Sequence, residues 1–213
     1  MTIRVLLADD HAVVRDGLKA LLQHTGDISV VGEAANGREA VRRSEELKPD
    51  VVVMDLAMPG LNGIDAARLV REKCPATQVV MLSMHSNSEH VYRAFEAGAG
   101  AFVLKESAGE EVAAAVRTVH VGQRYLSRAI TAIETDVRSC AGRASPLERL
   151  SEREREVLQL VVEGRSSAEI AATIHLSPKT VETYRGRLMA KLGVRDVPGL
   201  VRFAIEHGLT PPG

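Results

Sequence analysis

The segment that decides the fold is Val51-Val52-Val53-Met54-Asp55, followed by Leu56-Ala57-Met58-Pro59-Gly60. Four consecutive apolar residues, three of them β-branched, predict a strand that is buried on both faces. The strand delivers the Asp55 carboxylate to the point where Met58-Pro59-Gly60 turns the chain. An aspartate at this point can simply cap the next loop or helix. It can also serve a ligand, because ligands of open parallel sheets bind at the carboxyl ends of the strands.

Length and composition favour a soluble protein of one large or two small domains. The chain has 213 residues, of which 45% are hydrophobic and 26% charged, which is ordinary for a globular core. No apolar run is long enough to cross a bilayer, and the first residues enter a strand-like run without a signal peptide. Cys74 and Cys140 match no metal or redox spacing. We therefore expect a cytoplasmic protein with reduced thiols and no membrane partner.

Charge is distributed unevenly along the chain. Residues 1–121 hold 13 Lys/Arg against 17 Asp/Glu, a net charge of −4, whereas residues 122–213 hold 14 against 11, a net charge of +3. An acidic half followed by a basic half indicates two tasks, and the basic half is suited to a polyanionic partner.

The first half alternates short apolar runs with helical patterns. The runs cover residues 3–8, 28–31, 51–55, 78–82 and 101–104. Five strands alternating with five helices predict a flavodoxin-like, doubly wound parallel α/β sheet in the order 2-1-3-4-5. Ser107 and Glu110 have the spacing of a capping box, which predicts the start of the fifth helix.

Polar side chains gather at equivalent strand ends. The first, third, fourth and fifth strands end in Asp9-Asp10, Asp55, Ser83 and Lys105. Such a set at one sheet edge favours a site over four unrelated caps. Clustered carboxylates repel one another, and a hard divalent cation such as Mg²⁺ relieves that repulsion. A carboxylate held beside Mg²⁺, a lysine and a hydroxyl can act as nucleophile toward a phosphoryl group.

These motifs resemble the receiver domain of two-component response regulators, over residues 1–121. The resemblance implies that Asp55 is the phospho-acceptor, and that Ser83 and Lys105 contact the phosphoryl group. It also implies that Asp9 and Asp10 bind the metal with Asp55 and the backbone carbonyl of Ala57.

The same resemblance makes Phe102 the switch aromatic, which turns inward on activation as the Ser83 hydroxyl moves. A plain core phenylalanine explains Phe102 equally well. One departure from the family pattern is Glu106, which stands where proline often follows the lysine. A cis peptide bond is not expected without that proline.

Residues 122–147 predict a linker, because they lack a clear apolar period. Residues 129–137 could form a short helix, and residues 139–146 are small, polar and broken, as in a flexible tether.

Residues 148–213 predict a four-helix domain. Ser151 and Glu154 form a capping-box pair, Ser167 starts a second helix, and Ser177-Pro178 starts a third that Gly193 ends. A fourth helix covers residues 197–207. A short helix, a tight turn and then a basic helix is the helix-turn-helix arrangement.

The motif order in this half resembles the LuxR-type helix-turn-helix, and with the receiver it indicates the NarL/FixJ class of response regulators. The third helix is then the recognition helix, and the fourth contributes to dimerisation. The expected DNA-binding residues are Ser177, Lys179, Thr180, Glu182, Thr183, Arg185, Arg187 and Lys191. Tyr184 and Gly186 depart from the pattern expected on this helix, so a target sequence cannot be transferred from a relative.

The sequence therefore predicts a regulator that a sensor histidine kinase phosphorylates on Asp55 with Mg²⁺. Phosphorylation would control homodimerisation and binding to double-stranded DNA. The receiver would catalyse only its own phosphoryl transfer and dephosphorylation, and would not be an enzyme otherwise. Three alternatives are a receiver that is a protein-interaction module beside constitutive DNA binding, an aspartyl-phosphate phosphatase, and a second domain that binds protein.

Overall fold

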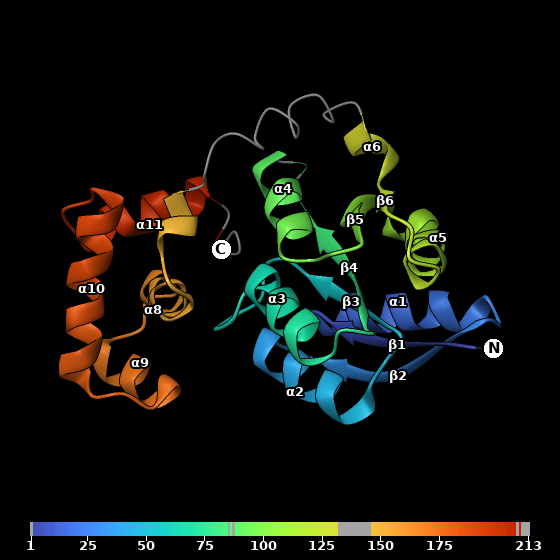
Figure 1. The fold of residues 1–213 in the computed structure, drawn as a ribbon, viewed down its shortest axis with the longest axis horizontal. Coiled ribbons are helices and arrows are strands. Elements are labelled where there is room, and N and C mark those ends of the chain that lie inside the picture. Colours follow the sequence, from blue (N-terminus) through green and yellow to red (C-terminus); the bar gives the residue numbers. More distant parts are fainter. Residues whose placement is uncertain (1, 85, 87, 132–145, 208, 210–213) are drawn as a thin grey trace. The chain divides into compact units, whose positions relative to one another are not determined.

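A parallel six-stranded sheet in the order β2-β1-β3-β4-β5-β6 forms the centre of the first of two structural units (Figure 1). The structure is a computed structural model that describes residues 2–84, 86, 88–131, 146–207 and 209. The chain divides into residues 1–142 and residues 143–213. The five expected strands and their order are confirmed, and a sixth strand is added.

Strands and helices alternate through the first unit. The strands are β1 (Ile3–Ala8), β2 (Ile28–Ala34), β3 (Val51–Asp55), β4 (Gln78–Ser83), β5 (Ala101–Leu104) and β6 (Tyr125–Leu126). The helices are α1 (Ala12–His24), α2 (Gly37–Leu47), α3 (Gly63–Lys73), α4 (Ser88–Glu96), α5 (Ala108–His120) and α6 (Arg128–Thr131), with a 3₁₀ turn at Lys105–Ser107.

Helices cover both faces of the sheet. Residues of α1 and α5 pack on one face with Val51 and Val53, whereas residues of α2, α3 and α4 pack on the other with Val52 and Met54. All five residues of β3 are buried. This explains why β3 is a continuous apolar run rather than an alternating one, because a central parallel strand has no solvent face.

The sixth strand lies in the segment expected to be a linker. Tyr125 and Leu126 pair in parallel with Ala101 and Phe102, and Ile130 is fully buried in the core on the side of α2 to α4. Residues 125–130 thus belong to the first unit, which corrects the expectation that all of residues 122–147 form a linker. The rest of the expected short helix and the tether at residues 139–145 lie outside the described residues.

The start of α5 also differs from the expectation. Ser107 makes no capping hydrogen bond. Its hydroxyl donates to the carbonyl of Leu104 at 3.2 Å and lies 3.2 Å from the hydroxyl of Ser127. The predicted capping box is therefore wrong, because the 3₁₀ turn at Lys105–Ser107 leads directly into α5.

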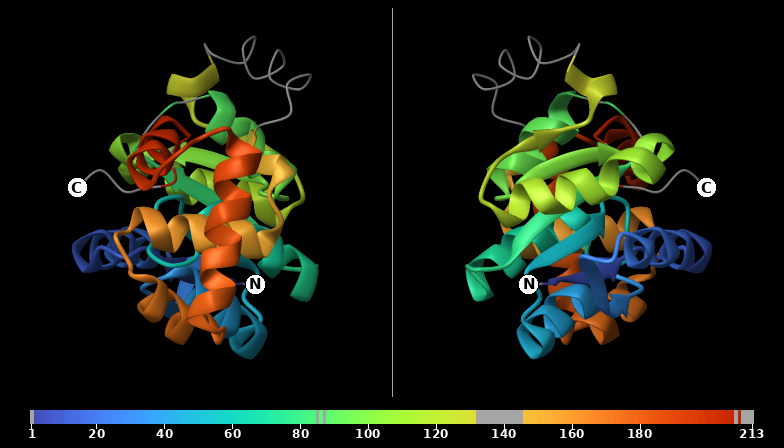
Figure 2. Two further views of the ribbon diagram at one scale, coloured as in Figure 1. Left: turned by 90° about the vertical axis from the view of Figure 1, so that its left-hand side faces the viewer. Right: turned by 90° about the vertical axis from the view of Figure 1, so that its right-hand side faces the viewer.

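The second unit is a small helical domain with its own core. It contains a 3₁₀ turn (Pro146–Arg149) and the helices α8 (Glu152–Val162), α9 (Ser167–Ile174), α10 (Pro178–Leu192) and α11 (Val197–Glu206). The left view of Figure 2 shows the long α10 crossing in front of α8. Leu158, Ile170, Val181, Leu188 and Leu200 are fully buried at the centre of this unit.

The helix ends of the second unit agree with the sequence signals. Ser151 and Glu154 form the predicted capping box of α8. Ser177 accepts the N–H of Thr180 at the start of α10, and Gly193 ends that helix with φ 68°. Between α9 and α10, His175 adopts a left-handed conformation with φ 56°, which makes the tight turn of the helix-turn-helix. No described helix is both long and apolar enough to span a membrane.

We expect Ile130→Ala to lower the free energy of unfolding of the first unit by about 2–4 kcal/mol, because it leaves a cavity in a closed core. Val121→Ala is the control, since Val121 is 68% exposed and should change stability by less than about 0.5 kcal/mol. Urea unfolding of the full chain, with amide hydrogen exchange as the probe of the first unit, measures the free energy of unfolding of both variants. Equal small effects would contradict the assignment of residues 125–131 to this core.

Candidate functional site

The carboxyl edge of the sheet collects the polar residues expected there. Asp9 follows β1, Asp55 ends β3 and Ser83 ends β4, and these residues are only 1%, 2% and 3% exposed. Lys105 is the first residue after β5. The register pairs Asp55 with Leu82 and Ser83 with Leu104, so neighbouring strands end at almost the same level. The geometry thus brings together the residues that the strand ends predicted.

A close backbone approach fixes the chain directly after Asp55. The N–H of Gly63, the first residue of α3, donates to the carbonyl of Leu56 at 2.9 Å. A Cβ atom at position 63 would lie 2.0 Å from the Asp55 carbonyl oxygen. Only glycine allows α3 to pack this tightly against the end of β3, and the packing holds the Asp55 backbone in place.

One ammonium group joins two buried carboxylates. Lys105 Nζ lies 2.8 Å from Asp9 Oδ2 and 2.9 Å from Asp55 Oδ2. The lysine side chain is 10% exposed. Burial alone would lower the pKa of Lys105, but the charges of Asp55 and Asp9 outweigh burial and raise it. Lys105 therefore stays cationic at neutral pH.

Burial, followed by the negative charge of Asp9, raises the pKa of Asp55 to about 6. Lys105 and the backbone N–H of Ala57 act in the opposite direction by stabilising the carboxylate. At neutral pH the group is therefore ionised, although it is held in an environment that disfavours a second negative charge. A bound cation would relieve this conflict.

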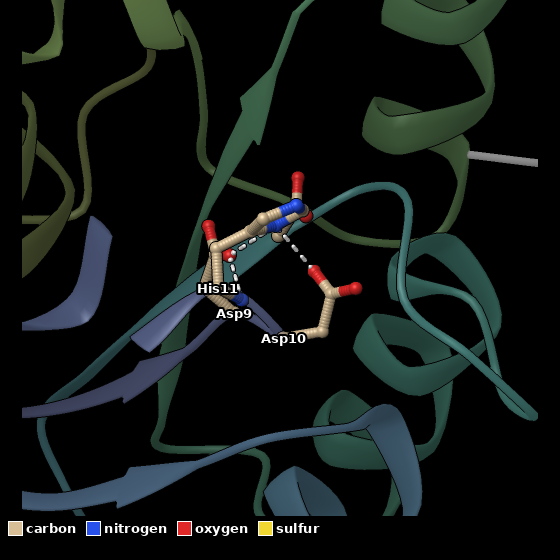
Figure 3. Close-up of side chains that lie close together, drawn as sticks. Asp9, Asp10 and His11 are labelled. Atoms are coloured by element: carbon tan, nitrogen blue, oxygen red, sulfur yellow. Dashed lines mark hydrogen bonds and ion pairs between the residues drawn. The ribbon is translucent and has the colours of Figure 1, made fainter. Parts of the chain in front are cut away.

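Four residues could hold that cation. The nearest ligand atoms of Asp9, Asp10, His11 and Asp55 all lie within 4.8 Å of one another. Three of them are the predicted metal ligands, and carboxylate oxygens suit Mg²⁺. The sequence analysis missed His11, whose only signal was its position directly after the acidic pair. Figure 3 shows the ring of His11 beside the carboxylates of Asp9 and Asp10. The carboxylates present fit Mg²⁺, and Lys105 holds two of them, Asp9 and Asp55, beside each other.

The remaining predicted receiver residues occupy the expected neighbourhood. Phe102 is fully buried on β5, facing the α2-to-α4 side of the core, so its ring is already inward in this structure. No cis peptide bond occurs in the described chain, at Lys105–Glu106 or elsewhere. The roles of Ala57 as a carbonyl ligand and of Ser83 and Phe102 as switch residues stay predictions.

The predicted DNA-binding residues of α10 separate into two groups. Lys179, Glu182, Thr183 and Arg187 are exposed, while Ser177 and Thr180 form the first turn, with their hydroxyl oxygens 2.8 Å apart. The helix α10 therefore presents polar and cationic groups to solvent along much of its length, as a recognition helix requires.

Two of the cations on α10 are held by the domain itself. Arg185 Nη1 donates to Ser167 Oγ at 2.7 Å and lies 3.4 Å from Glu182 Oε1. Lys191 Nζ donates to Glu154 Oε2 at 2.7 Å. Burial alone would raise the pKa of Glu154, but the hydrogen bonds from Lys191 and Ser151 outweigh it and lower the pKa. Lys191 is 43% exposed, but its ammonium group is bound to Glu154 and so stabilises the start of α8.

A buried aspartate site on a doubly wound sheet, combined with a helix-turn-helix unit, defines a response regulator with DNA-binding output. Residues 5–117 match the response regulator receiver domain, and residues 148–204 match the bacterial regulatory proteins of the luxR family. The chain belongs to the response regulators with a LuxR-type DNA-binding domain, the NarL/FixJ class.

Similar proteins match most or nearly all of the chain. The response regulator protein VraR of Staphylococcus aureus is 37% identical over 98% of this chain and 99% of its own. A LuxR-family two-component response regulator from Aurantimonas is 38% identical with a TM-score of 0.62, over 65% of this chain and 99% of its own. A structure of two RcsB dimers bound to two parallel DNAs is 25% identical with a TM-score of 0.59, over 96% and 98%.

Asp55→Asn is expected to raise the free energy of unfolding of the first unit by about 1–3 kcal/mol in EDTA at pH 7.5. Burial and Asp9 raise the folded-state pKa of Asp55 from 3.8 to about 6. Ionisation of Asp55 therefore lowers the stability of the folded state as the pH rises from about 4 to about 6. Above that range the loss of stability is complete and stays constant. The gain should therefore grow between pH 4 and about 6.5 and then stay constant. Denaturant unfolding across this range measures it, with Asp16→Asn as control. A gain that does not vary with pH would show that the raised pKa of Asp55 is not its cause.

Lys191→Met should change the stability of the second unit, whereas Arg187→Gln should change its binding to DNA. Lys191→Met removes the ammonium partner of the Glu154 carboxylate, a side chain that is only 4% exposed, and leaves that carboxylate with the backbone N–H of Ser151. Stability should therefore fall by about 1–2 kcal/mol, with no change in the salt dependence of DNA binding. Arg187→Gln should leave stability unchanged and lower the slope of log K against log salt by about 0.9, one phosphate contact. Thermal unfolding and binding titrations at several salt concentrations test both. The reverse pattern would show that Lys191, not Arg187, contacts DNA.

Proposed function

We propose that this chain is a cytoplasmic transcription regulator that a partner histidine kinase phosphorylates on Asp55 in the presence of Mg²⁺. Phosphorylation switches the receiver unit and thereby controls dimerisation and sequence-specific DNA binding. The observation that carries the proposal is the pair of contacts from Lys105 Nζ to Asp9 and Asp55, at 2.8 and 2.9 Å. A nucleophile at Asp55 would therefore be ionised and would lie beside a fixed cation at the polar carboxyl edge of the sheet.

The chemistry needs no general base. A carboxylate oxygen of Asp55 attacks the phosphorus of a phosphohistidine, a P–O bond forms, and the P–N bond breaks as the released imidazole takes up a proton. The carboxyl pKa of about 6 means that Asp55 is already deprotonated at neutral pH. Mg²⁺ held by Asp9, Asp10 and Asp55 would supply positive charge to the transferring phosphoryl oxygens.

Lys105 and Ser83 stabilise the product. The Lys105 ammonium lies within hydrogen-bond distance of Asp55 Oδ2, so it can follow the negative charge onto a phosphoryl group attached to that carboxylate. The buried Ser83 hydroxyl on the neighbouring strand supplies a neutral donor. A shift of Ser83 and Lys105 then reaches Phe102 through β5, which connects the site to the rest of the receiver.

The relatives support dimeric DNA binding. RcsB dimers are bound to DNA in a related structure, and α10 in this chain offers the exposed Lys179 and Arg187 to phosphates or bases.

Labelling with acetyl phosphate and MgCl₂ tests the proposal. We expect acyl phosphate on the wild-type chain and on Asp16→Asn, which removes an exposed aspartate outside the site, and none on Asp55→Asn. Intact-mass spectrometry measures the phosphoryl group, and light scattering measures the dimer. Selection from a random duplex library should recover one sequence class with the phosphorylated protein.

Two results would decide against the proposal. Labelling that persists in Asp55→Asn would move the nucleophile elsewhere. Absence of Mg²⁺-dependent labelling in every variant, together with the same DNA selection before and after treatment, would leave a constitutive DNA-binding protein whose receiver is an interaction module.

A further inference from the structure

A serine of α9 contacts two charged side chains of α10. Ser167 is the first residue of α9, and Glu182 and Arg185 lie three residues apart on α10. The Ser167 hydroxyl donates to Glu182 Oε1 and accepts a hydrogen bond from Arg185 Nη1 at 2.7 Å. Arg185 Nη1 also lies 3.4 Å from Glu182 Oε1. Each of the three side chains therefore contacts the other two.

Capping of α9 does not explain the position of the Ser167 hydroxyl. The N-cap of this helix is Ser166, whose side chain accepts the N–H of Glu169 and forms a capping box with it. Within the described chain, the Ser167 hydroxyl contacts only Glu182 and Arg185. A serine hydroxyl has one hydrogen to donate and two lone pairs that accept, so this one group can join a carboxylate to a guanidinium.

The core of the second unit fixes the two helices that carry these side chains. Ile170 of α9 and Val181 of α10 are fully buried in the same cluster. Figure 1 shows α9 beside the beginning of α10. Because the backbones are held by this core, the contacts of Ser167 act on the ends of the two long side chains, which otherwise keep several rotamers.

These contacts leave one oxygen of the Glu182 carboxylate for another partner. Ser167 and Arg185 both contact Oε1, and Oε2 has no hydrogen-bond partner among the described residues. The side chain of Glu182 is 62% exposed, whereas that of Arg185 is 19% exposed. The carboxylate is thus open to solvent, while the cation that offsets its charge is largely covered.

A carboxylate on a recognition helix has a narrow use in DNA binding. Phosphates repel it, so it adds nothing to general affinity for DNA. In the major groove it can accept a hydrogen bond from the N4 amino group of cytosine. A side chain that is ordered before binding loses less conformational freedom when it makes such a contact, so ordering Glu182 would favour base readout.

We propose that Ser167 is a positioning residue for base readout, which orients the Glu182 carboxylate so that Oε2 accepts a hydrogen bond from cytosine. Arg185 offsets the negative charge of Glu182 near the phosphates. Base preference then depends on a residue of α9, outside the recognition helix. The inference rests on the proposed function, because it requires sequence-specific binding to double-stranded DNA.

Selection from a random duplex library, with the full chain treated with acetyl phosphate and MgCl₂, tests the inference. The wild type should recover a sequence class containing a cytosine that Glu182→Ala no longer prefers. The discrimination ratio is the affinity for the selected duplex divided by that for the duplex in which this base pair is replaced. Ser167→Ala should lower the ratio at least about five-fold, and Ser167→Thr, which keeps a hydroxyl, should restore it.

Two controls separate positioning from a purely structural effect. Thr173→Ala removes another hydroxyl of α9, one that donates to the carbonyl of Glu169 at 2.9 Å, and should keep the wild-type ratio. Loss of folded protein weakens binding to both duplexes equally and leaves the ratio unchanged. In the Glu182→Ala background, Ser167→Ala should change the ratio by less than about two-fold, because both substitutions remove the same base contact.

The outcomes distinguish this inference from the proposed function. If Ser167→Ala weakens binding to both duplexes equally, Ser167 contacts a phosphate or supports the fold, and the inference fails. It also fails if Glu182→Ala keeps the base preference of the wild type, although sequence-specific binding then stands. A wild-type chain that selects no sequence class would contradict the proposed function itself.

Discussion

The arrangement of this receiver depends on one buried ion network, in which the Lys105 ammonium lies between the carboxylates of Asp9 and Asp55. Charges are costly to bury, and only close pairing in good geometry offsets that cost. The three residues come from three different strand ends, so the network forms only when β1, β3 and β5 keep their register. A slip of one residue would place a charge in the core.

The apolar strands fix the register that the ion network needs. Val51, Val52 and Met54 are fully buried, as are Val79, Val80 and Met81 of the neighbouring strand, and together they hold the sheet edge rigidly between two helical layers. The network is nevertheless unbalanced, because two buried carboxylates face one ammonium. Burial first, and the charge of Asp9 second, raise the pKa of Asp55, and under the proposed function this environment favours binding of a cation.

Much of this was predictable from sequence, and the exceptions have physical causes. Apolar runs and their polar ends predicted the strands, the strand order and the meeting of Asp9, Asp55, Ser83 and Lys105, because burial and the period of a strand are local properties. The strand β6 was not predictable, since two residues carry no period and pair only because β5 offers a free edge. The place of His11 depends on one backbone turn, which no spacing rule describes.

Long side chains were the least predictable, and this changes how the recognition helix should be understood. Sequence counting gives α10 four cations and one acid, a net charge of +3. Yet Arg185 is held by Ser167 and Glu182, and Lys191 by Glu154. These partners lie on other helices or one turn away, so only the folded domain reveals them.

Fewer free cations on α10 mean fewer phosphate contacts for one domain, and each contact contributes separately to affinity. Lys179 and Arg187 remain exposed, so under the proposed function a single helix-turn-helix unit would bind DNA weakly through this helix. Joining two units makes the second binding event intramolecular and multiplies the affinity without any new contact. A receiver that controls only the distance between two such units would therefore control DNA binding, and it need not reshape the recognition helix at all.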